Sequence, residues 1–378
     1  MSPIMTNFTP CETRLMTQLI RSAFRYKGKT FPNPVVGAAV YHATQENTPI
    51  STGFHVRYGA SHAETVALDA AGSRAHGASL MVTLSPCTHD GNTPPCVDAI
   101  IRAGISEVVI AVDDPNPIVK QRSSIQTLQE AGIKVRVGLC ESEAMDINAG
   151  FFLWMREKVP YVHLKAGMSI DGVIALHSGE SKYITSKSSL KQVHKLRREV
   201  QAIIVGIGTV LADQPTLNVR HGLNRKGYTL PRRVILDPMG KTPLDAAILD
   251  SNAGGQSIVC VSLHCPADKK DALAQIATVW ELPMAKYGLS WTALLSRLGL
   301  EGIQDILIEG GQKIFTSAIS ENIVDCCHLF MAPIILGSPG MSHPFNVSSI
   351  QSLSDGHRFA RWQHQRCGTD LYVKGWLN

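Results

Sequence analysis

One histidine and two cysteines in the first third of the chain have the types and positions expected of a catalytic zinc site. His62 opens a predicted helix, Cys87 follows a predicted strand, and Cys96 begins the next predicted helix. Residues at helix starts can converge on one point, and a catalytic zinc uses three such ligands while leaving a fourth position for the water that it acidifies. We therefore predict that His62, Cys87 and Cys96 bind Zn²⁺.

Glu64 lies two residues after the histidine and is predicted to carry a proton rather than to bind the metal. A carboxylate there can take the proton from the activated water and pass it to a leaving amino group. The His-x-Glu and Pro-Cys pattern resembles that of the zinc nucleobase deaminases, which implies hydrolytic deamination of an amidine-like ring carbon. A zinc-stabilised regulatory module and unrelated core thiols are the alternatives, since lone His and Cys residues usually serve packing.

The loop between Cys87 and Cys96 is eight residues long, whereas nucleic-acid and nucleoside deaminases have only a few residues there. This loop and the segments 33–37, 53–64 and 114–117 closely resemble the deaminase half of the bifunctional riboflavin-biosynthesis deaminase/reductase family. The resemblance implies a cytidine-deaminase-like, three-layer α/β/α domain that acts on a phosphorylated pyrimidine. The implied contacts to the pyrimidine or its phosphoribosyl arm are Asn33, His55, His89, Asp114 and Asn116.

The second half of the chain has a glycine pair at a predicted strand-to-helix turn. Residues 305–308 are predicted to be a strand, and Gly310 and Gly311 precede a helix predicted from Lys313. Backbone N–H groups at such a turn can approach a phosphate at the positive end of the helix, although Gly-Gly also marks many plain loops. The half contains no Gly-x-Gly-x-x-Gly motif, so a Rossmann dinucleotide fold has no support.

Segments 164–172, 179–186, 206–210, 213–220 and 308–311 resemble the reductase half of the same family. The resemblance implies a dihydrofolate-reductase-like α/β domain that uses NADPH to reduce a ribosylamine to a ribitylamine. The implied NADPH contacts are Gly167, Tyr183, Thr209, Asp213, Gly311, Gln312, Lys313, Ile314, Phe315, Thr316 and Ser317. The implied contacts to the phosphorylated sugar are Lys165, Ser181, Arg197, Leu217, Arg220 and Glu309.

The side-chain types in this second set suit a phosphorylated sugar. Arg197 and Arg220 can hold a phosphate in bidentate fashion, and Lys165 can donate to an oxygen that gains charge during hydride transfer. Six positions depart from the family pattern: Ser85, Asn92, Val173, Tyr183, Gln201 and Gln214. We expect reduction to survive with altered affinity, and the alternative is an active deaminase that carries a catalytically silent reductase-like domain.

The elements that position these residues alternate between strand and helix in both halves, a pattern typical of sheets covered by helices. In the first half we predict helices at 12–26, 61–71, 96–103 and 125–131, with strands at 35–40, 80–84, 107–112 and 134–137. A helix-like connector, 148–158, leads to strands at 161–165, 202–205, 233–236, 257–261 and 305–308 and helices at 188–198, 290–298 and 313–319. The predicted domains are therefore a deaminase, 1–157, and a reductase, 158–378.

Length and composition fit a two-domain globular enzyme. The chain has 378 residues, 18% of them charged, and a net charge of +5 without a block of like charges, which suits a small anionic substrate. An RNA-binding protein is the rival class, but aromatic residues make up only 6% of the chain. We expect no nucleic-acid partner, no membrane segment, no secretion signal, reduced cysteines and a cytoplasmic location. The family resemblance implies a homo-oligomer.

Overall fold

The computed structural model describes residues 7–42, 48–88, 94–116, 123–178, 184–224, 226–251, 254–337, 341–347 and 350–377. The chain divides into two compact units, Met1–Glu157 and Lys158–Asn378. Each unit is a mixed α/β structure, which confirms the predicted fold class. Among the described residues, no helix combines the length and apolarity that crossing a membrane requires.

The first unit is built around a five-stranded sheet with strand order β2-β1-β3-β4-β5. Strand β1 pairs antiparallel with β2 and β3, and the β3, β4 and β5 ladders are parallel. The elements of this unit are α1 (Pro10–Phe24), β1 (Gly37–Tyr41), β2 (Ser51–Phe54), α2 (Ala63–Ala71), β3 (Ser79–Val82), α3 (Cys96–Arg102), β4 (Glu107–Ile110), α5 (Ser124–Glu130), β5 (Lys134–Val137), α6 (Glu141–Ile147) and α7 (Ala149–Glu157).

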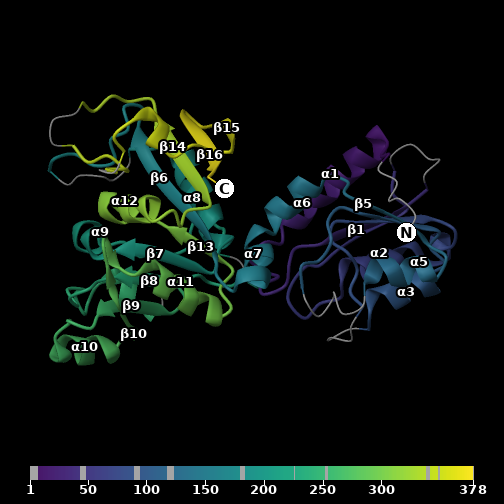
Figure 1. Cartoon of the computed structure of the whole chain (residues 1–378), viewed down its shortest axis with the longest axis horizontal. Helices are drawn as coiled ribbons and strands as arrows, with labels where there is room; N and C mark the ends of the chain where they lie inside the picture. Colours follow the sequence, from purple (N-terminus) through teal and green to yellow (C-terminus); the bar gives the residue numbers. More distant parts are fainter. Residues whose placement is uncertain are drawn as a thin grey trace. The chain divides into compact units, whose positions relative to one another are not determined.

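Helices cover both faces of this sheet, so the unit has the three predicted layers. Figure 1 shows α1 and α6 over one face and α2, α3 and α5 over the other. Helix α1 begins where Thr9 and Glu12 form a reciprocal capping box around Pro10, and it buries the stripe that contains Leu15 and Leu19. The sequence did not predict β2 or α6, because β2 is short and half exposed and α6 has a single buried residue, Ala144.

The second unit is built around a nine-stranded sheet with strand order β10-β9-β8-β7-β13-β6-β14-β16-β15. The first seven strands in this order, β10 through β14, run parallel to one another, and β16 and β15 add an antiparallel edge. Its elements are β6 (Tyr161–Ser169), α8 (Lys187–Arg198), β7 (Ala202–Gly206), α9 (Ile207–Asp213), β8 (Arg232–Leu236), β9 (Ser257–Ser262), α10 (Ala267–Ala274), β10 (Thr278–Leu282), β11 (Met284–Ala285), β12 (Gly288–Leu289), α11 (Trp291–Leu300), β13 (Asp305–Ile308), α12 (Gln312–Ser320), β14 (Cys326–Ala332), β15 (Arg361–Cys367) and β16 (Asp370–Trp376).

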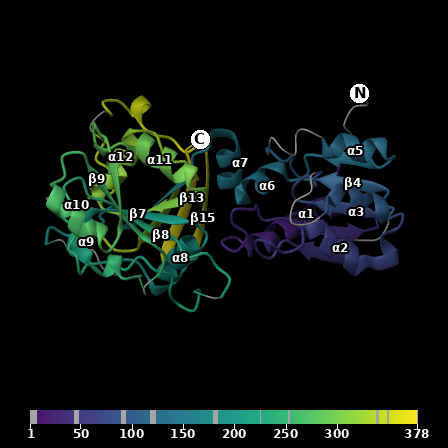
Figure 2. The same cartoon turned by 90° about the horizontal axis from the view of Figure 1, so that it is seen from below.

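Two apolar clusters fill the two faces of this larger sheet. One packs α11 and α12 against alternate residues of the strands, such as Leu164 and Ile306. The other packs α8 and α9 against residues of the opposite face, such as Ile203 and Leu307. Figure 2 shows α11 and α12 on one side of these strands and α8 on the other. Every predicted strand of this half is present, but the sequence did not predict β10, β11 and β12 or the last three strands, β14, β15 and β16.

Candidate active sites

The three predicted zinc ligands converge at one edge of the five-stranded sheet. His62 is the N-cap residue of α2, Cys96 is the first residue of α3, and Cys87 lies in the loop after β3. The Nδ1 atom of His62 lies 3.2 Å from Sγ of Cys96 and 3.5 Å from Sγ of Cys87. All three ligand atoms lie within 4.8 Å of one another. One histidine nitrogen and two thiol sulfurs at this spacing fit a zinc ion with an open position.

Close packing between β2 and α2 sets the position of His62. A Cβ atom at Gly53 would lie 2.1 Å from the carbonyl oxygen of Ala63, so only glycine permits this approach of strand and helix. The hydroxyl of Ser51 also donates to the carbonyl of Ala67, 2.6 Å away. The N-terminus of α2 is thereby fixed against the sheet edge. The helix predicted at 61–71 therefore begins two residues later than expected, at Ala63.

The charges around the three ligands favour a thiolate and a protonatable carboxyl group. The backbone N–H of Cys96 donates to Sγ of Cys87 at 3.4 Å. The hydrogen bond from the Cys96 thiol, followed by that from His62, lowers the pKa of Cys87 to about 4. Glu64 is buried, and desolvation together with the charge of Cys87 raises its pKa to about 7. A carboxyl group with such a pKa is suited to accepting and returning a proton near neutral pH.

Asn33 and His55 extend the site away from the metal ligands. Nδ2 of Asn33 lies 3.2 Å from Nε2 of His55, and Nδ1 of His55 lies 3.2 Å from the carbonyl oxygen of Ser61. The rings of His55 and His62 meet edge to face, with centroids 5.6 Å apart. Asn148, which was not predicted from the sequence, has a buried side chain that accepts from the N–H of Val35 at 2.8 Å and donates to its C=O at 2.9 Å. Asn148 therefore fixes the loop that carries Asn33.

Asp114 and Asn116 lie in the loop that follows β4, and their interactions shape that loop. The carboxylate of Asp114 accepts from the backbone N–H of Asn116 at 2.8 Å, as in an Asx turn. Ser85 accepts from the N–H of Asp114 and donates to the carboxylate of Asp113, both at 2.8 Å. Ser85, one of the departures from the family pattern, thus ties this loop to the segment that leads to Cys87.

In the second unit, the predicted substrate residues Lys165, Arg197 and Glu309 form one charged cluster. Arg197 donates from Nε and Nη2 to the two carboxylate oxygens of Glu309 at 2.6 and 3.0 Å, and Nζ of Lys165 lies 3.8 Å from the same carboxylate. Burial would raise the pKa of Glu309, but the charges of Arg197 and Lys165 outweigh it and lower the pKa to about 2. Burial lowers the pKa of Lys165, and Glu309 opposes that shift.

Arg197 is held by the protein on two sides. Its third nitrogen, Nη1, donates to the carbonyl of Asn218 at 3.0 Å, so each of its three nitrogens makes a hydrogen bond within the protein. Glu309 occupies the Nε–Nη2 side of the guanidinium group, and phosphate binding by Arg197 stays a prediction. Arg220 is exposed, and its backbone N–H donates to Nδ1 of His194 at 3.1 Å.

The glycine turn lies beside this cluster, at the carboxyl ends of neighbouring parallel strands. Strands β7, β13 and β6 are adjacent, and Gly206 ends β7 while Gly310 and Gly311 follow β13. A Cβ atom at Gly206 would lie 2.6 Å from Ile314, so glycine allows α12 to begin close to the sheet. The N–H of Gly311 donates to Oγ1 of Thr209 at 3.0 Å, which holds the starts of α9 and α12 together.

Not every predicted cofactor or substrate residue faces this turn. Phe315 packs in the core between α12 and the sheet, and Ser317 is buried where it accepts from Nε1 of Trp291 at 3.1 Å. An α-helix turns through a full circle in 3.6 residues, so seven consecutive residues cannot all face one ligand. The side chain of Leu217 is buried in the core on the α8 face. These three side chains are buried, so a contact of these residues with a ligand would have to involve the backbone, and it stays a prediction.

Gly167 lies near the carboxyl end of the central strand β6, and Asp213 lies at the carboxyl end of helix α9. Gly167 lies on β6, where a Cβ atom would lie 3.3 Å from the side chain of Thr185. Asp213 is the last residue of α9 and is partly buried. The helix residues Gln312, Lys313, Ile314 and Thr316 are partly buried or exposed at the first turns of α12. His89, Asn92, Ser181 and Tyr183 lie outside the described residues.

Three further residues that depart from the family pattern lie in the described part of the chain. Gln201 precedes β7, at the sheet edge opposite to the glycine turn, where its side chain bonds the N–H of Gln304 and the C=O of Gly302. Val173 is buried, and its N–H donates to Oγ of Ser169 at 2.9 Å. Gln214 is the C-cap of α9 with a left-handed φ of 44°. The Gln201 departure is thus remote from the charged cluster.

Two family models match the chain, one in each unit. The model described as "RibD C-terminal domain" matches residues 160–373, and the model described as "Cytidine and deoxycytidylate deaminase zinc-binding region" matches residues 9–112. The first of these covers more than half of the chain.

Whole-chain relatives carry one common name. The riboflavin biosynthesis protein RibD of Aquifex aeolicus is 38% identical, over 93% of this chain and 94% of that protein. The RibD of Escherichia coli is 34% identical, over 94% of this chain and 96% of its own. A solved structure of Acinetobacter baumannii RibD has 34% identity and a TM-score of 0.83, and covers 97% of this chain and 99% of that chain. A diaminohydroxyphosphoribosylaminopyrimidine deaminase/5-amino-6-(5-phosphoribosylamino)uracil reductase of Thermotoga maritima has 31% identity, a TM-score of 0.81 and the same coverage.

Proposed function

The chain belongs to the RibD family of riboflavin biosynthesis proteins, and from that premise we propose its substrate and the division of labour between its two units. Residues 1–157 deaminate 2,5-diamino-6-ribosylamino-4(3H)-pyrimidinone 5′-phosphate, a small phosphorylated pyrimidine. Residues 158–378 then reduce the ribosyl group of the product to a ribityl chain with NADPH. The observation that supports this proposal most is the convergence of His62, Cys87 and Cys96 beside the buried carboxyl group of Glu64.

In the deaminase unit, His62, Cys87 and Cys96 would hold zinc, and Glu64 would move the proton. Zinc bound by such ligands supplies an acidified water as the nucleophile for the ring carbon. Glu64 accepts a proton from the attacking water and returns it to the amino group that leaves as ammonia. The burial of Glu64 excludes bulk water from that transfer. Asn33 and His55, which are joined by a contact of 3.2 Å, form the adjacent substrate wall.

We assign recognition of the phosphorylated arm to the loops around the deaminase site. Asp114 and Asn116 belong to the loop that Ser85 ties to the Cys87 segment, so they are held near the metal ligands. His89 belongs to the same proposed set by its sequence position. These residue types can donate to and accept from a pyrimidine and its ribose hydroxyl groups.

In the reductase unit, the N-terminal end of α12 and the C-terminal end of β6 would flank NADPH and the sugar. NADPH supplies the hydride. Gly311 and the first turn of α12 offer a glycine turn and a helix N-terminus to a phosphate, with Thr209 holding the turn. Lys165, which lies beside the carboxylate of Glu309, donates to the sugar oxygen that gains a proton as the carbon is reduced. Gly167, Asp213, Gln312, Lys313, Ile314 and Thr316 complete the proposed cofactor set, with Tyr183 by sequence position; Arg220 and Ser181 complete the sugar set.

Variants that separate the two activities test the division of labour. Glu64→Gln should lose ammonia release while still oxidising NADPH when it is given the deaminated product. Arg220→Ala should keep ammonia release and bind the phosphorylated sugar of that product more weakly, seen as a raised KM for NADPH oxidation. A Glu64→Gln protein with full ammonia release would refute the deaminase assignment. Wild-type protein that never oxidises NADPH would instead establish a silent reductase-like domain.

We further propose a cytoplasmic homo-oligomer. None of the nine cysteines, all of which the structure describes, forms a disulfide, and zinc-binding thiolates are typical of a reducing compartment. Among the described residues β15 pairs within the sheet with β16 alone, so its outer backbone groups can pair with a second copy of the chain. Light scattering on the full chain measures the assembly: a single-chain mass at micromolar concentration would refute the oligomer.

A further inference from the structure

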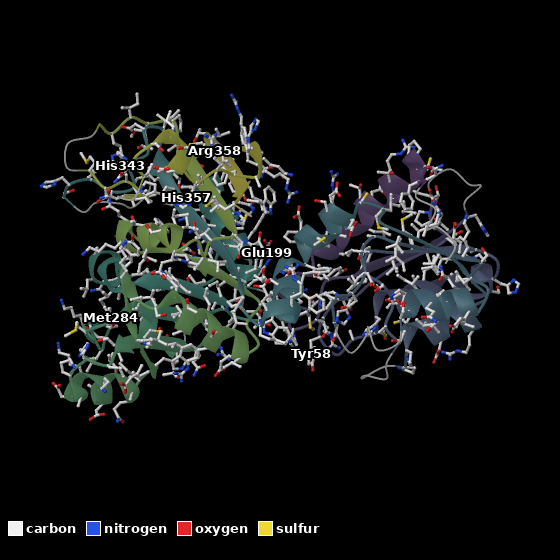
Figure 3. The ribbon with its side chains drawn as sticks, in the orientation of Figure 1. Tyr58, Glu199, Met284, His343, His357 and Arg358 are labelled. Carbon is white, nitrogen blue, oxygen red and sulfur yellow. The ribbon has the colours of Figure 1, made fainter. Side chains whose placement is uncertain are left out.

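A second cluster of metal-binding side chains lies in the other unit, on the paired strands β6 and β14. The parallel register places Cys326 opposite His163 and His328 opposite Lys165. Cys326 and His328 are two residues apart, so they project from the same face of β14. Strands β6, β14 and β16 lie side by side in Figure 1. The face that carries the cluster is the one covered by α8, whose C-cap residue, Glu199, is labelled in Figure 3.

The three ligand atoms have the spacing of a tetrahedral zinc site. Nδ1 of His163 lies 3.1 Å from Nε2 of His328, and Sγ of Cys326 lies 3.7 Å from the same Nε2. Zinc–nitrogen and zinc–sulfur bonds at tetrahedral angles separate two nitrogens by about 3.3 Å and a nitrogen from a sulfur by about 3.6 Å. All three atoms lie within 4.8 Å of one another, as do the three ligand atoms of the His62 site.

Each imidazole has a partner on the nitrogen that points away from the cluster. Nε2 of His163 lies 3.3 Å from Oδ1 of Asp305, and Nδ1 of His328 lies 2.7 Å from the hydroxyl of Tyr372. A carboxylate behind a histidine fixes the ring orientation and makes the opposite nitrogen a better metal ligand. Both rings can therefore turn a lone pair toward Cys326 while their remaining N–H groups are satisfied.

The three residues of the cluster differ in how far solvent can reach them. Cys326 and His328 are buried, whereas the side chain of His163 keeps 19% of its surface exposed. An ion can thus reach the cluster past His163 and then lose most of its water to protein ligands. The cluster lies on β6 two residues before Lys165, which is about 7 Å along a strand. A metal ion here would link β6 to β14 next to the charged cluster of Lys165, Arg197 and Glu309.

We propose that His163, Cys326 and His328 form a second zinc site that joins β6 to β14 in the reductase unit, with a water molecule as the fourth ligand. Two imidazoles and one thiol select zinc over magnesium or calcium, which prefer oxygen ligands. Binding releases the thiol proton of Cys326 to solvent, because the thiolate is the ligand. This site is separate from His62, Cys87 and Cys96 and does not depend on the proposed reaction.

Zinc content of the purified full chain, measured by mass spectrometry of the metal, tests the proposal. The wild type should hold two zinc ions per chain. His163→Asn and Cys326→Ser should each hold one, Cys96→Ser should hold one, and the Cys96→Ser/Cys326→Ser double variant should hold none. The matched control is Cys327→Ala, because Cys327 is equally buried on β14 but faces the opposite apolar cluster. It should hold two.

Cobalt substitution and a melting curve provide readouts that are independent of activity. Cys96→Ser loaded with Co²⁺ should show a thiolate-to-cobalt absorption band that disappears in Cys96→Ser/His163→Asn. Zinc should raise the melting temperature of Cys96→Ser and leave that of Cys96→Ser/His163→Asn unchanged. His163→Asn serves as the second variant because His163 is partly exposed and its replacement does not open a buried cavity.

Two results would overturn the proposal. A wild-type chain with a single zinc ion that Cys96→Ser removes would show that the second cluster binds none. An unchanged count of two in both His163→Asn and Cys326→Ser would place the second ion elsewhere. In either case the contacts from Tyr372 through His328 and His163 to Asp305 form only a hydrogen-bond chain between strands.

Discussion

Glu64 differs from the zinc ligands beside it in what it can do, because it is a buried carboxyl group on the first turn of α2 rather than a member of the ligand triangle. Replacement by Gln keeps the shape but removes the ability to exchange a proton. We expect Glu64→Gln to release ammonia about 10²- to 10⁴-fold more slowly, with unchanged zinc at the His62 site. Ammonia release and zinc content, measured on one preparation, check this prediction. Loss of zinc in the variant would instead mean that Glu64 is structural.

Glu309 holds two cations in the reductase unit, and its loss leaves both without their shared carboxylate. We expect Glu309→Gln to lower the free energy of unfolding by about 3 to 5 kcal/mol, because removing one partner of a buried ion pair leaves the other charge buried and uncompensated. NADPH oxidation should fall, while ammonia release should persist. Glu301→Gln is the matched control, because the Glu301–Arg232 pair is exposed and such pairs contribute about 0 to 1 kcal/mol. Equal urea midpoints for the two variants would contradict the assigned role.

At the scale of elements, the contact between β2 and α2 determines where His62 and Glu64 lie. Gly53→Ala would force a Cβ atom onto the backbone of α2. We expect it to cost about 1 to 3 kcal/mol and to slow ammonia release without affecting reduction of the deaminated product. Gly208→Ala is the control, since a Cβ atom there meets nothing within 4 Å. Unaltered ammonia release in Gly53→Ala would show that the approach of strand and helix is not needed.

The start of α1 is joined to β4 and β5 through an ion network that should respond to acid. Arg136 donates to both Glu12 and Glu107, and the hydroxyl of Tyr41 donates to Glu12 at 3.1 Å. Burial would raise the pKa of Glu12, but the hydrogen bonds from Arg136 and Thr9 outweigh it and lower the pKa to about 2, from an unfolded value near 4.5. The stabilisation is therefore complete above the unfolded value and is lost as the pH falls from about 4.5 toward 2.

Glu12→Gln should remove this acid dependence. We expect the loss of unfolding free energy between pH 6 and 3 to shrink by on the order of 2 kcal/mol in the variant. Hydrogen exchange of the α1 amides, which reports on this unit alone, gives the free energies. The exposed Glu143→Gln on α6 should keep the wild-type slope. Parallel pH profiles for Glu12→Gln and the wild type would argue against the network.

Sequence patterns predicted the elements that carry strong local signals. The metal ligands His62 and Cys96 lie at the starts of helices. Strand β13 was predicted because its apolar run is followed directly by a glycine pair, which is a turn signal. Other features depend on contacts between distant residues. Asn148 binds the loop that carries Asn33 although it lies more than a hundred residues further along the chain, and the residues next to Asn148 in the sequence give no signal of this role. The pairing of Glu309 with Arg197 likewise arises only when β13 and α8 are packed together.

The second metal cluster shows the same limit. Cys326 and His328 have the spacing that places two side chains on one face of a strand, but the sequence did not predict β14, the strand that carries them. His163 joins them only because the chain order of the sheet places β6 beside β14. Phe315 and Ser317 show a related limit, because a family contact list does not distinguish the buried face of a helix from its ligand-facing end.

At the scale of the whole molecule, each unit has its own sheet, its own core and its own candidate site. Every residue proposed for deamination lies within 1–157, and every residue proposed for reduction lies within 158–378. Two consecutive reactions in riboflavin biosynthesis should therefore proceed in one chain, and altering one site should leave the other active when that other site is given its own substrate.

The most direct test is to add the diaminopyrimidine ribosylamine phosphate to zinc-loaded, full-length protein with NADPH and to follow ammonia release and NADPH oxidation together. We predict both signals, with NADPH oxidation following ammonia release, and with Glu64→Gln losing both unless deaminated product is supplied. Ammonia without NADPH oxidation would contradict the bifunctional account and leave a deaminase with a silent second unit. Absence of ammonia release would contradict the assignment of His62, Cys87, Cys96 and Glu64.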